Sequence, residues 1–139
     1  MYVVILGGGH VGAGLANWFL ESGSEVTIID SDKDKTDILN ESLGKICVLG
    51  DGSSVNVLEE AGLTRTDMFI GTTGEDHINL FACQIVKEKY EVQTTVSVLN
   101  ESNNGKLFEM AGINCVVDTS RLVIEEIESA LAPTLVEEV

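Results

Sequence analysis

Short apolar runs alternate with amphipathic stretches along most of this chain. Each run has the length of a buried strand, and the runs lie near residues 2–6, 25–30, 46–49, 67–71, 94–99 and 115–117. Between the runs, apolar residues recur every three or four positions. This spacing predicts helices near residues 11–22, 32–43, 53–61, 75–89, 105–111 and 120–131. Strands that alternate with helices in this way indicate a parallel sheet with helices on both faces.

The order of the elements predicts an α/β fold of the Rossmann-like, doubly wound type. Right-handed crossovers favour a parallel six-stranded sheet with the strand order 3-2-1-4-5-6. A ligand then lies in the crevice where the order reverses. We expect one domain over residues 1–132 and a short acidic tail over residues 133–139, because the single proline, Pro133, follows the last predicted helix.

The first apolar run stops abruptly at a glycine cluster. Gly7, Gly9 and Gly12 have the G-x-G-x-x-G spacing of a phosphate-binding turn. The first glycine allows a sharp turn, the second has no Cβ to keep a pyrophosphate away, and the third lets the next helix pack close to the strand. The free N–H groups and the dipole of that helix then face the phosphates. The predicted phosphate-binding residues are Gly7, Gly8, Gly9, His10, Val11 and Gly12.

An acidic residue follows the second apolar run. Asp30 lies 18 residues after Gly12, close to the offset of about 20 at which a carboxylate binds the ribose in dinucleotide sites. We expect Asp30, with Ser31 beside it, to accept hydrogen bonds from both ribose hydroxyls. The alternative is a glycine turn that holds no ligand, with Asp30 capping the next helix.

Two further loops follow strands and should open on the same crevice. In the first, Asp51 can accept a hydrogen bond from an adenine amine while Gly52 lets a flat ring approach. A plain turn, in which Asp51 bonds its own backbone, is an equal alternative. In the second loop, Thr72 and Thr73 offer hydroxyls and amides to ribose or phosphate, and capping of the next helix is compatible with that role.

The formal net charge of −15 excludes two classes of partner, free nucleic acid and an anionic membrane surface, because the chain forms no basic stripe. The apolar runs are too short to span a bilayer or to form a signal peptide. Cys47, Cys83 and Cys115 lack the C-x-x-C spacing of a zinc site. Cys47 and Cys115 lie in strand-like runs and are expected to be small buried side chains in a reducing cytosol. We identify no metal-binding residues.

Several segments together resemble the N-terminal RCK domain, also called TrkA-N or KTN, of Trk/Ktr-type potassium-transport regulatory proteins. The segments are 6–12, 28–30, 48–52, 58–62, 71–80 and 110–117. The Gly-Asp-Gly of residues 50–52 and the Thr-Gly-Glu-Asp-His-Ile-Asn of residues 73–79 are far more specific than the glycine turn. The resemblance covers nearly the whole chain, from Met1 to about Leu131.

The resemblance implies a function as well as a fold. Such domains bind NAD(H) or adenine nucleotides, and they assemble as homodimers or larger rings on the cytoplasmic side of a potassium transporter or channel. Nucleotide-dependent movement of the ring then alters ion flux. Carried onto this chain, residues 7–12 would hold phosphate, Asp30 ribose, Asp51 and Gly52 adenine, and Thr72 with Thr73 the far side of the site.

This chain departs from the family pattern at two positions. Many relatives carry arginine where His10 and Val98 stand here, so a triphosphate has fewer charge partners. NAD(H) is therefore favoured, with ADP or ATP as the alternative cofactor. A protonated His10 would supply some positive charge, and the alternative is an exposed histidine without a role. The smaller second domain often found downstream is missing, which predicts a truncated chain or a short subunit.

We expect a regulatory protein rather than an enzyme, and we identify no catalytic residues. The rival hypothesis is the cofactor-binding fragment of an NAD-dependent dehydrogenase, but neither His10 nor His77 has companions for hydride or proton transfer. A third hypothesis is a nucleotide sensor without a transporter partner.

Two helices carry apolar residues beyond one face, which suggests contact surfaces. In the last helix, Val123, Ile127, Ala130 and Leu131 form an apolar face that either transmits the signal or packs on its own sheet. In the fourth helix, Ile78, Phe81, Ala82 and Ile85 are expected to face inward, leaving Leu80 and Cys83 for a neighbouring molecule.

Overall fold

The computed structural model describes residues 1–137 of the chain. Its six strands are β1 Tyr2–Leu6, β2 Glu25–Asp30, β3 Cys47–Leu49, β4 Met68–Gly71, β5 Thr94–Leu99 and β6 Cys115–Asp118. Its α-helices are α1 His10–Glu21, α2 Lys33–Leu43, α3 Val55–Glu60, α4 Asp76–Tyr90, α5 Gly105–Met110 and α6 Thr119–Glu137. Two short 3₁₀ helices, η1 Leu63–Arg65 and η2 Ser102–Asn104, complete the described elements.

The strands form one sheet in the order β3-β2-β1-β4-β5-β6. All neighbouring strands are parallel. The doubly wound α/β architecture predicted from the sequence is therefore confirmed. The order reverses between β1 and β4, which lie side by side at the centre of the sheet.

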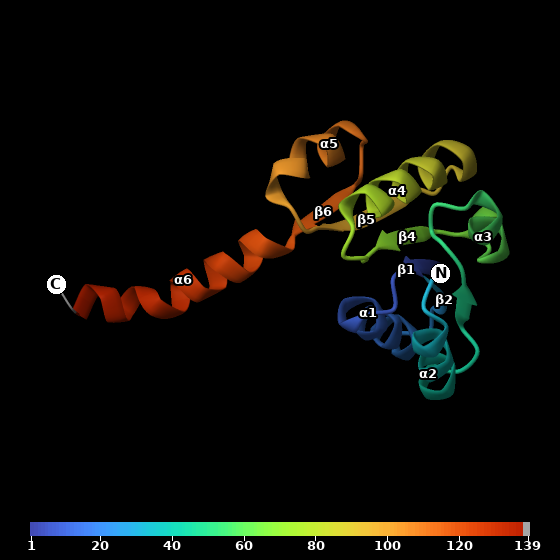
Figure 1. The fold of residues 1–139 in the computed structure, drawn as a ribbon, viewed down its shortest axis with the longest axis horizontal. Helices are drawn as coiled ribbons and strands as arrows, with labels where there is room; N and C mark the ends of the chain where they lie inside the picture. The colour runs from blue at the N-terminus through green and yellow to red at the C-terminus, as the bar shows by residue number, and fades with distance from the viewer. Residues whose placement is uncertain (138–139) are drawn as a thin grey trace.

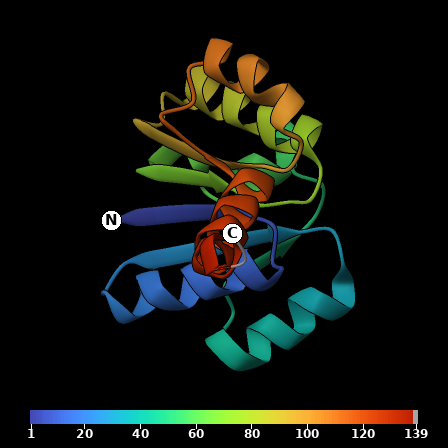
Figure 2. The same cartoon turned by 90° about the vertical axis from the view of Figure 1, so that its left-hand side faces the viewer.

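The sheet is covered on both faces. All five residues of β1 are buried, as expected for a central strand packed from both sides. One apolar cluster joins α1 and α2 to one face through Ala16, Phe19 and Leu39. The other cluster joins α3 and α4 to the opposite face through residues such as Leu58 and Val86. Figure 2 shows these layers, with α1 and α2 below the strands and α4 and α5 above them.

The last helix differs from the prediction. It does not end near residue 131 but continues to Glu137 with Pro133 inside it, and it projects away from the sheet (Figure 1). Leu131 and Leu135 carry its apolar repeat across the proline, and both side chains are exposed. The expected tail is thus helical as far as Glu137, and its final residues, 138–139, lie outside the described residues.

The projection of α6 leaves its apolar side chains uncovered. Val123, Ile127 and Leu131 are each more than half exposed, so the hypothesis that this helix packs on its own sheet is wrong. Cys115 on the edge strand β6 is exposed as well, contrary to prediction, because β6 has a neighbouring strand on one side only and α6 does not cover it. Cys47 is partly buried.

The buried face of α4 agrees with the prediction in part: Ala82 is buried, and Ile78 and Ile85 pack against the core. Phe81 is 45% exposed while Cys83 is 1% exposed, the reverse of the prediction. The inward stripe consists of Asp76, Asn79, Ala82, Cys83 and Val86. Two polar side chains thus occupy positions that an apolar repeat cannot reveal.

Candidate functional site

A cleft opens where the strand order reverses, at the carboxyl ends of the central strands. Its volume is about 410 Å³, within the range of roughly 300–1,000 Å³ typical of small-molecule sites. The lining residues are Leu6, Gly7, Gly9, Ile29, Asp30, Ser31, Lys35, Gly50, Asp51, Gly52, Thr72, Thr73, Gly74, Glu75 and Ile78. The structure therefore has a cleft at the place where the sequence predicts a ligand.

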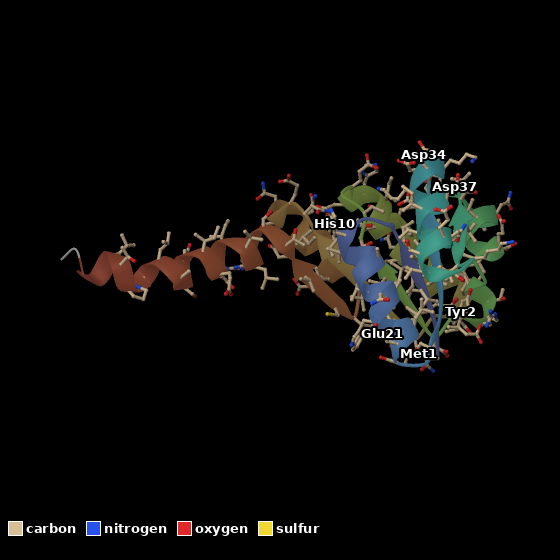
Figure 3. The ribbon with its side chains drawn as sticks, turned by 90° about the horizontal axis from the view of Figure 1, so that it is seen from below. Met1, Tyr2, His10, Glu21, Asp34 and Asp37 are labelled. Atoms are coloured by element: carbon tan, nitrogen blue, oxygen red, sulfur yellow. The ribbon has the colours of Figure 1, made fainter. Side chains whose placement is uncertain are left out.

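Most of the predicted site residues line this cleft, including Asp30, Ser31 and both loops that carry Asp51 and Thr72. The predicted residues outside the lining are Gly8, His10, Val11 and Gly12. His10 and Val11 begin α1 with exposed side chains, and Figure 3 shows His10 at the end of this helix opposite Glu21.

The glycine turn has the geometry that its spacing predicts. Gly7 has a φ of +105°, a conformation that favours glycine. A Cβ on Gly12 would collide with the carbonyl oxygen of Gly7, so only glycine lets α1 pack this close to the turn. A Cβ on Gly9 would meet no described heavy atom within 4 Å. The space above Gly9 is therefore open to an approaching group.

Asp30 holds the glycine turn in addition to facing the cleft. Its Oδ2 accepts a hydrogen bond from the Gly8 N–H at 2.7 Å, and its Oδ1 accepts one from the Asp32 N–H at 2.9 Å. Asp32, not Asp30, caps α2 by accepting a hydrogen bond from the Lys35 N–H. A carboxylate has about four lone-pair sites, so two remain on Asp30 for a ligand's hydroxyl groups.

The Asp51 loop forms the turn in which Asp51 bonds nearby backbone, one of the two alternatives that the sequence offered, and Asp51 also lines the cleft. One oxygen of Asp51 accepts hydrogen bonds from the Ser53 N–H and hydroxyl, each at 2.8 Å. These bonds hold the pKa of Asp51 below its ordinary value, so the group is ionised at neutral pH. Gly52 lies against the cleft floor, where a Cβ would collide with Leu6. The turn thus presents a fixed carboxylate at the cleft.

The Thr72–Thr73 loop is braced by hydrogen bonds within the protein. The Thr72 hydroxyl reaches the carbonyl oxygens of Leu6 and Gly7, at 2.9 and 3.0 Å. The Thr73 hydroxyl and N–H both bond the side-chain oxygen of the buried Asn79. The two hydroxyl hydrogens are therefore engaged, and these bonds connect the loop to the glycine turn and to α4.

Comparison with known proteins decides the family. The model of the TrkA-N domain matches residues 3–135. The chain belongs to the TrkA-N family. It is 31% identical over 131 residues to the Trk system potassium uptake protein TrkA homolog of Methanothermobacter thermautotrophicus, covering 94% of this chain and 60% of that relative. This TrkA-N domain is thus related to potassium transport proteins and spans less than two thirds of that relative's length.

Solved structures agree on the fold. The TrkA-N domain of inner membrane protein ybaL from Escherichia coli superposes with a TM-score of 0.85 at 20% identity, over 94% of this chain and 96% of that one. The GsuK structure bound to ADP superposes with a TM-score of 0.79 at 24% identity, over 94% and 33% of the two chains. Within residues 1–137 of the TrkA-N domain, none of the helices combines the length and apolar character that crossing a bilayer requires.

Sequence reasoning missed several residues of the TrkA-N cleft. Lys35, in the first turn of α2, lies with its Nζ 4.0 Å from Asp30 Oδ2. Among the described lining residues it is the one cation, against the carboxylates of Asp30, Asp51 and Glu75. Lys35 follows Asp30 by five residues at the start of the next helix, and this nearness in sequence was a signal that could have been used. Ile78 adds an apolar wall on the α4 side.

A buried acid beside the cleft was also missed. Asp76 is only 8% exposed and accepts hydrogen bonds from the Asn100 and Glu101 backbones and from two amide side chains. Burial by itself raises the pKa of Asp76, but these hydrogen bonds outweigh burial and lower the pKa below its ordinary value. Asp76 is therefore an ionised anchor for the loop after β5.

Proposed function

We propose that this domain is a nucleotide-binding regulator of potassium transport. It binds an adenine nucleotide in the cleft, NAD(H) in preference to ATP, and gates a transporter or channel through a ligand-dependent change in its oligomer. The observation that carries the proposal is a cleft built of the glycine turn and Asp30 at the reversal of the strand order, in a TrkA-N chain. The ligand would be held by backbone amides at its phosphates and by the Asp30 carboxylate at its ribose.

The ligands of similar structures support an adenine nucleotide. The GsuK channel has been solved bound to NAD and GsuK also bound to ADP, and the Kef C-terminal domain of Shewanella denitrificans in an AMP-bound form. The feature common to these ligands is the adenosine phosphate. In this domain the carboxylates of Asp30 and Asp51 suit the ribose hydroxyls and the adenine amine at one end of the cleft.

The charge balance of the cleft favours a dinucleotide over a triphosphate. Its described lining residues include three carboxylates and a single lysine, and the whole chain carries a net charge of −15. A triphosphate brings more negative charge than a dinucleotide into this field, and no arginine is among the described lining residues to receive it. The helix N-terminus and the turn amides are sufficient for a pyrophosphate.

Titration calorimetry with NADH, NAD⁺, ADP and ATP tests the binding proposal. We expect saturable binding of NADH and NAD⁺ and weaker binding of ATP. If the heat of injection equals the heat of dilution for all four nucleotides, the result would contradict nucleotide binding by this cleft. Turnover of an alcohol or oxo acid with NAD(H) would point instead to a dehydrogenase.

NADH is expected to bind at least about tenfold more tightly than NADPH, equivalent to about 1.4 kcal/mol. The 2′-phosphate of NADPH would replace a hydroxyl donor with a negative group next to the Asp30 carboxylate. A change of ligand is a cleaner test than a change of Asp30, because Asp30 also holds the Gly8 N–H. Equal affinities, measured by calorimetry at one salt concentration, would remove this role for Asp30.

The oligomer that the proposal needs has a candidate surface on α6. Its exposed apolar side chains include Leu122, Ile124 and Ile127, and they are costly to leave in water. We propose that a homodimer or larger ring forms through such surfaces and docks on a membrane transporter at the cytoplasmic face. The nucleotide then shifts the population of ring conformations by its differential affinity.

The domain is expected to have a solution mass of at least twice the 14.9 kDa of one chain. Ile127→Glu should shift the mass toward that of the monomer, since it places a charge on the exposed apolar face. Glu128→Gln, its neighbour on the same helix, should leave the mass unchanged. Light scattering at several concentrations measures both variants. A wild-type mass of one chain throughout would contradict the oligomeric mechanism.

A further inference from the structure

The backbone of the cleft loop is tied to the loop after β5. The carbonyl oxygen of Thr73, a cleft residue, accepts hydrogen bonds from Asn79 Nδ2 and from Asn100 Nδ2, each at 3.0 Å. Asn79 belongs to the helix that follows Thr73, whereas Asn100 comes from the end of a neighbouring strand. A shift of the Thr73 peptide therefore displaces the partner of the Asn100 side chain.

Asp76 prevents Asn100 from adjusting independently. One oxygen of Asp76 accepts from the Asn100 N–H at 2.8 Å and from the Asn100 Nδ2 at 2.9 Å. The other oxygen accepts from the Glu101 N–H and from Asn104 Nδ2. Since the carboxylate is buried, losing these bonds would leave a charge desolvated without partners. Side chain and backbone of Asn100 are thus expected to move together.

The backbone of Asn100 in turn contacts the projecting helix. Its carbonyl oxygen accepts a hydrogen bond from the Ser120 hydroxyl at 3.0 Å, in the first turn of α6. The hydroxyl of Thr119 likewise reaches the Leu99 carbonyl oxygen at 3.2 Å. A continuous set of hydrogen bonds therefore runs from the cleft to the base of α6, the helix that stands away from the domain in Figure 1.

We propose that Asp76 and Asn100 are positioning residues that couple nucleotide occupancy of the cleft to the orientation of α6 through Ser120. The inference rests on the nucleotide binding proposed above and names the residues through which that binding would change the orientation of α6. A nucleotide that binds one position of the Thr73 peptide better than another shifts the Asn100 loop, and with it the base of α6. Nucleotide binding thereby changes the orientation of α6, although none of the described residues of α6 lines the cleft.

The distal end of the route offers a test that leaves the cleft intact. Ser120→Ala removes the hydroxyl that bonds Asn100, at an exposed position, so the NADH affinity should stay within about twofold of wild type. Hydrogen exchange is followed by mass spectrometry over residues 119–127, with and without saturating NADH. We expect NADH to change the exchange of this segment in the wild type and to have at most a small effect in Ser120→Ala.

Two control variants separate coupling from a general loosening of the helix. Ser120→Thr keeps a hydroxyl and should retain the NADH-induced change. Ser102→Ala removes a hydroxyl that bonds Asp118 at 2.7 Å, next to the base of α6 but off the route to Thr73, and it should also retain the change. A purely structural role for Ser120 would alter the exchange without ligand but not the difference that NADH makes.

The outcomes are distinct. An NADH-induced change that survives in Ser120→Ala would overturn the proposed route, as would bound NADH that leaves the exchange of residues 119–127 unaltered in the wild type. If calorimetry detects no nucleotide binding to the wild type, the proposed function itself fails and takes the coupling with it. Loss of the induced change in Ser120→Ala alone, with NADH affinity retained, supports the proposal.

Discussion

Gly9→Val is expected to fold like the wild type and to lose at least about 100-fold in nucleotide affinity, or about 2.7 kcal/mol. Gly9 precedes α1 with φ −75° and ψ −165°, an extended conformation that valine adopts readily. A Cβ there would meet no described heavy atom within 4 Å, so the fold has room for it. The branched side chain would occupy the space through which a pyrophosphate approaches the turn amides.

Calorimetry with NADH and thermal unfolding, carried out on the same preparation, check both halves of this expectation. Gly9→Ala serves as the graded control, because its single methyl group blocks less of the approach and should give an intermediate loss. If the valine variant unfolds at the wild-type temperature and still binds NADH with wild-type affinity, the glycine turn is not the phosphate site.

Gly12→Ala, unlike Gly9→Val, is expected to destabilise the fold. The expected loss of stability is about 3 kcal/mol, at the high end of the effects of overpacking. The new Cβ would lie against the carbonyl oxygen of Gly7 and also 2.9 Å from the Thr72 hydroxyl oxygen. Neither the backbone carbonyl nor the braced Thr72 side chain can give way easily, because the hydroxyl bonds two carbonyl groups. Either α1 moves off the sheet or the turn deforms.

Thermal and denaturant unfolding measure this loss, which corresponds to a fall of about 10 °C in Tm for a domain of this size. Gly14→Ala is the matched control on the same helix, since its Cβ would meet no described heavy atom within 4 Å. That variant should instead gain up to about 1 kcal/mol from higher helix propensity. Equal unfolding temperatures for Gly12→Ala and wild type would show that the close packing of α1 on the turn is not required.

The acidic residues show how far sequence reasoning reaches at the site. The interval from Gly12 to Asp30 was enough to place that acid in the cleft, because strand and helix lengths fix where the second strand ends. The bond from the Gly8 N–H to the same carboxylate was not foreseen. It depends on the turn curling back over the second strand, which no spacing rule describes.

The polar residues of α4 show what sequence reasoning fails to predict at the site. Asp76 and Asn79 follow the Thr-Thr-Gly loop, and acidic residues at the start of a helix are ordinarily solvated. Both are buried here because Asn100 and Thr73 reach them from other loops. Partners 24 and 6 residues away satisfy them, and a pattern of apolar positions cannot reveal such pairs. On the same helix, the prediction had the exposures of Phe81 and Cys83 the wrong way round.

By itself, the sequence determined the strands and the α-helices except the end of α6, the parallel arrangement and order of the strands, and the place of the cleft. Those features follow from local periodicity, glycine stereochemistry and the handedness of crossovers, which act over short stretches of chain. Only the tertiary structure decided that Asp30 holds the glycine turn, that Asp76 anchors the loop after β5, and that α6 projects with its apolar side chains uncovered. These depend on contacts between distant segments, or on their absence within residues 1–137, and such contacts arise only when the folded chain brings loop ends together.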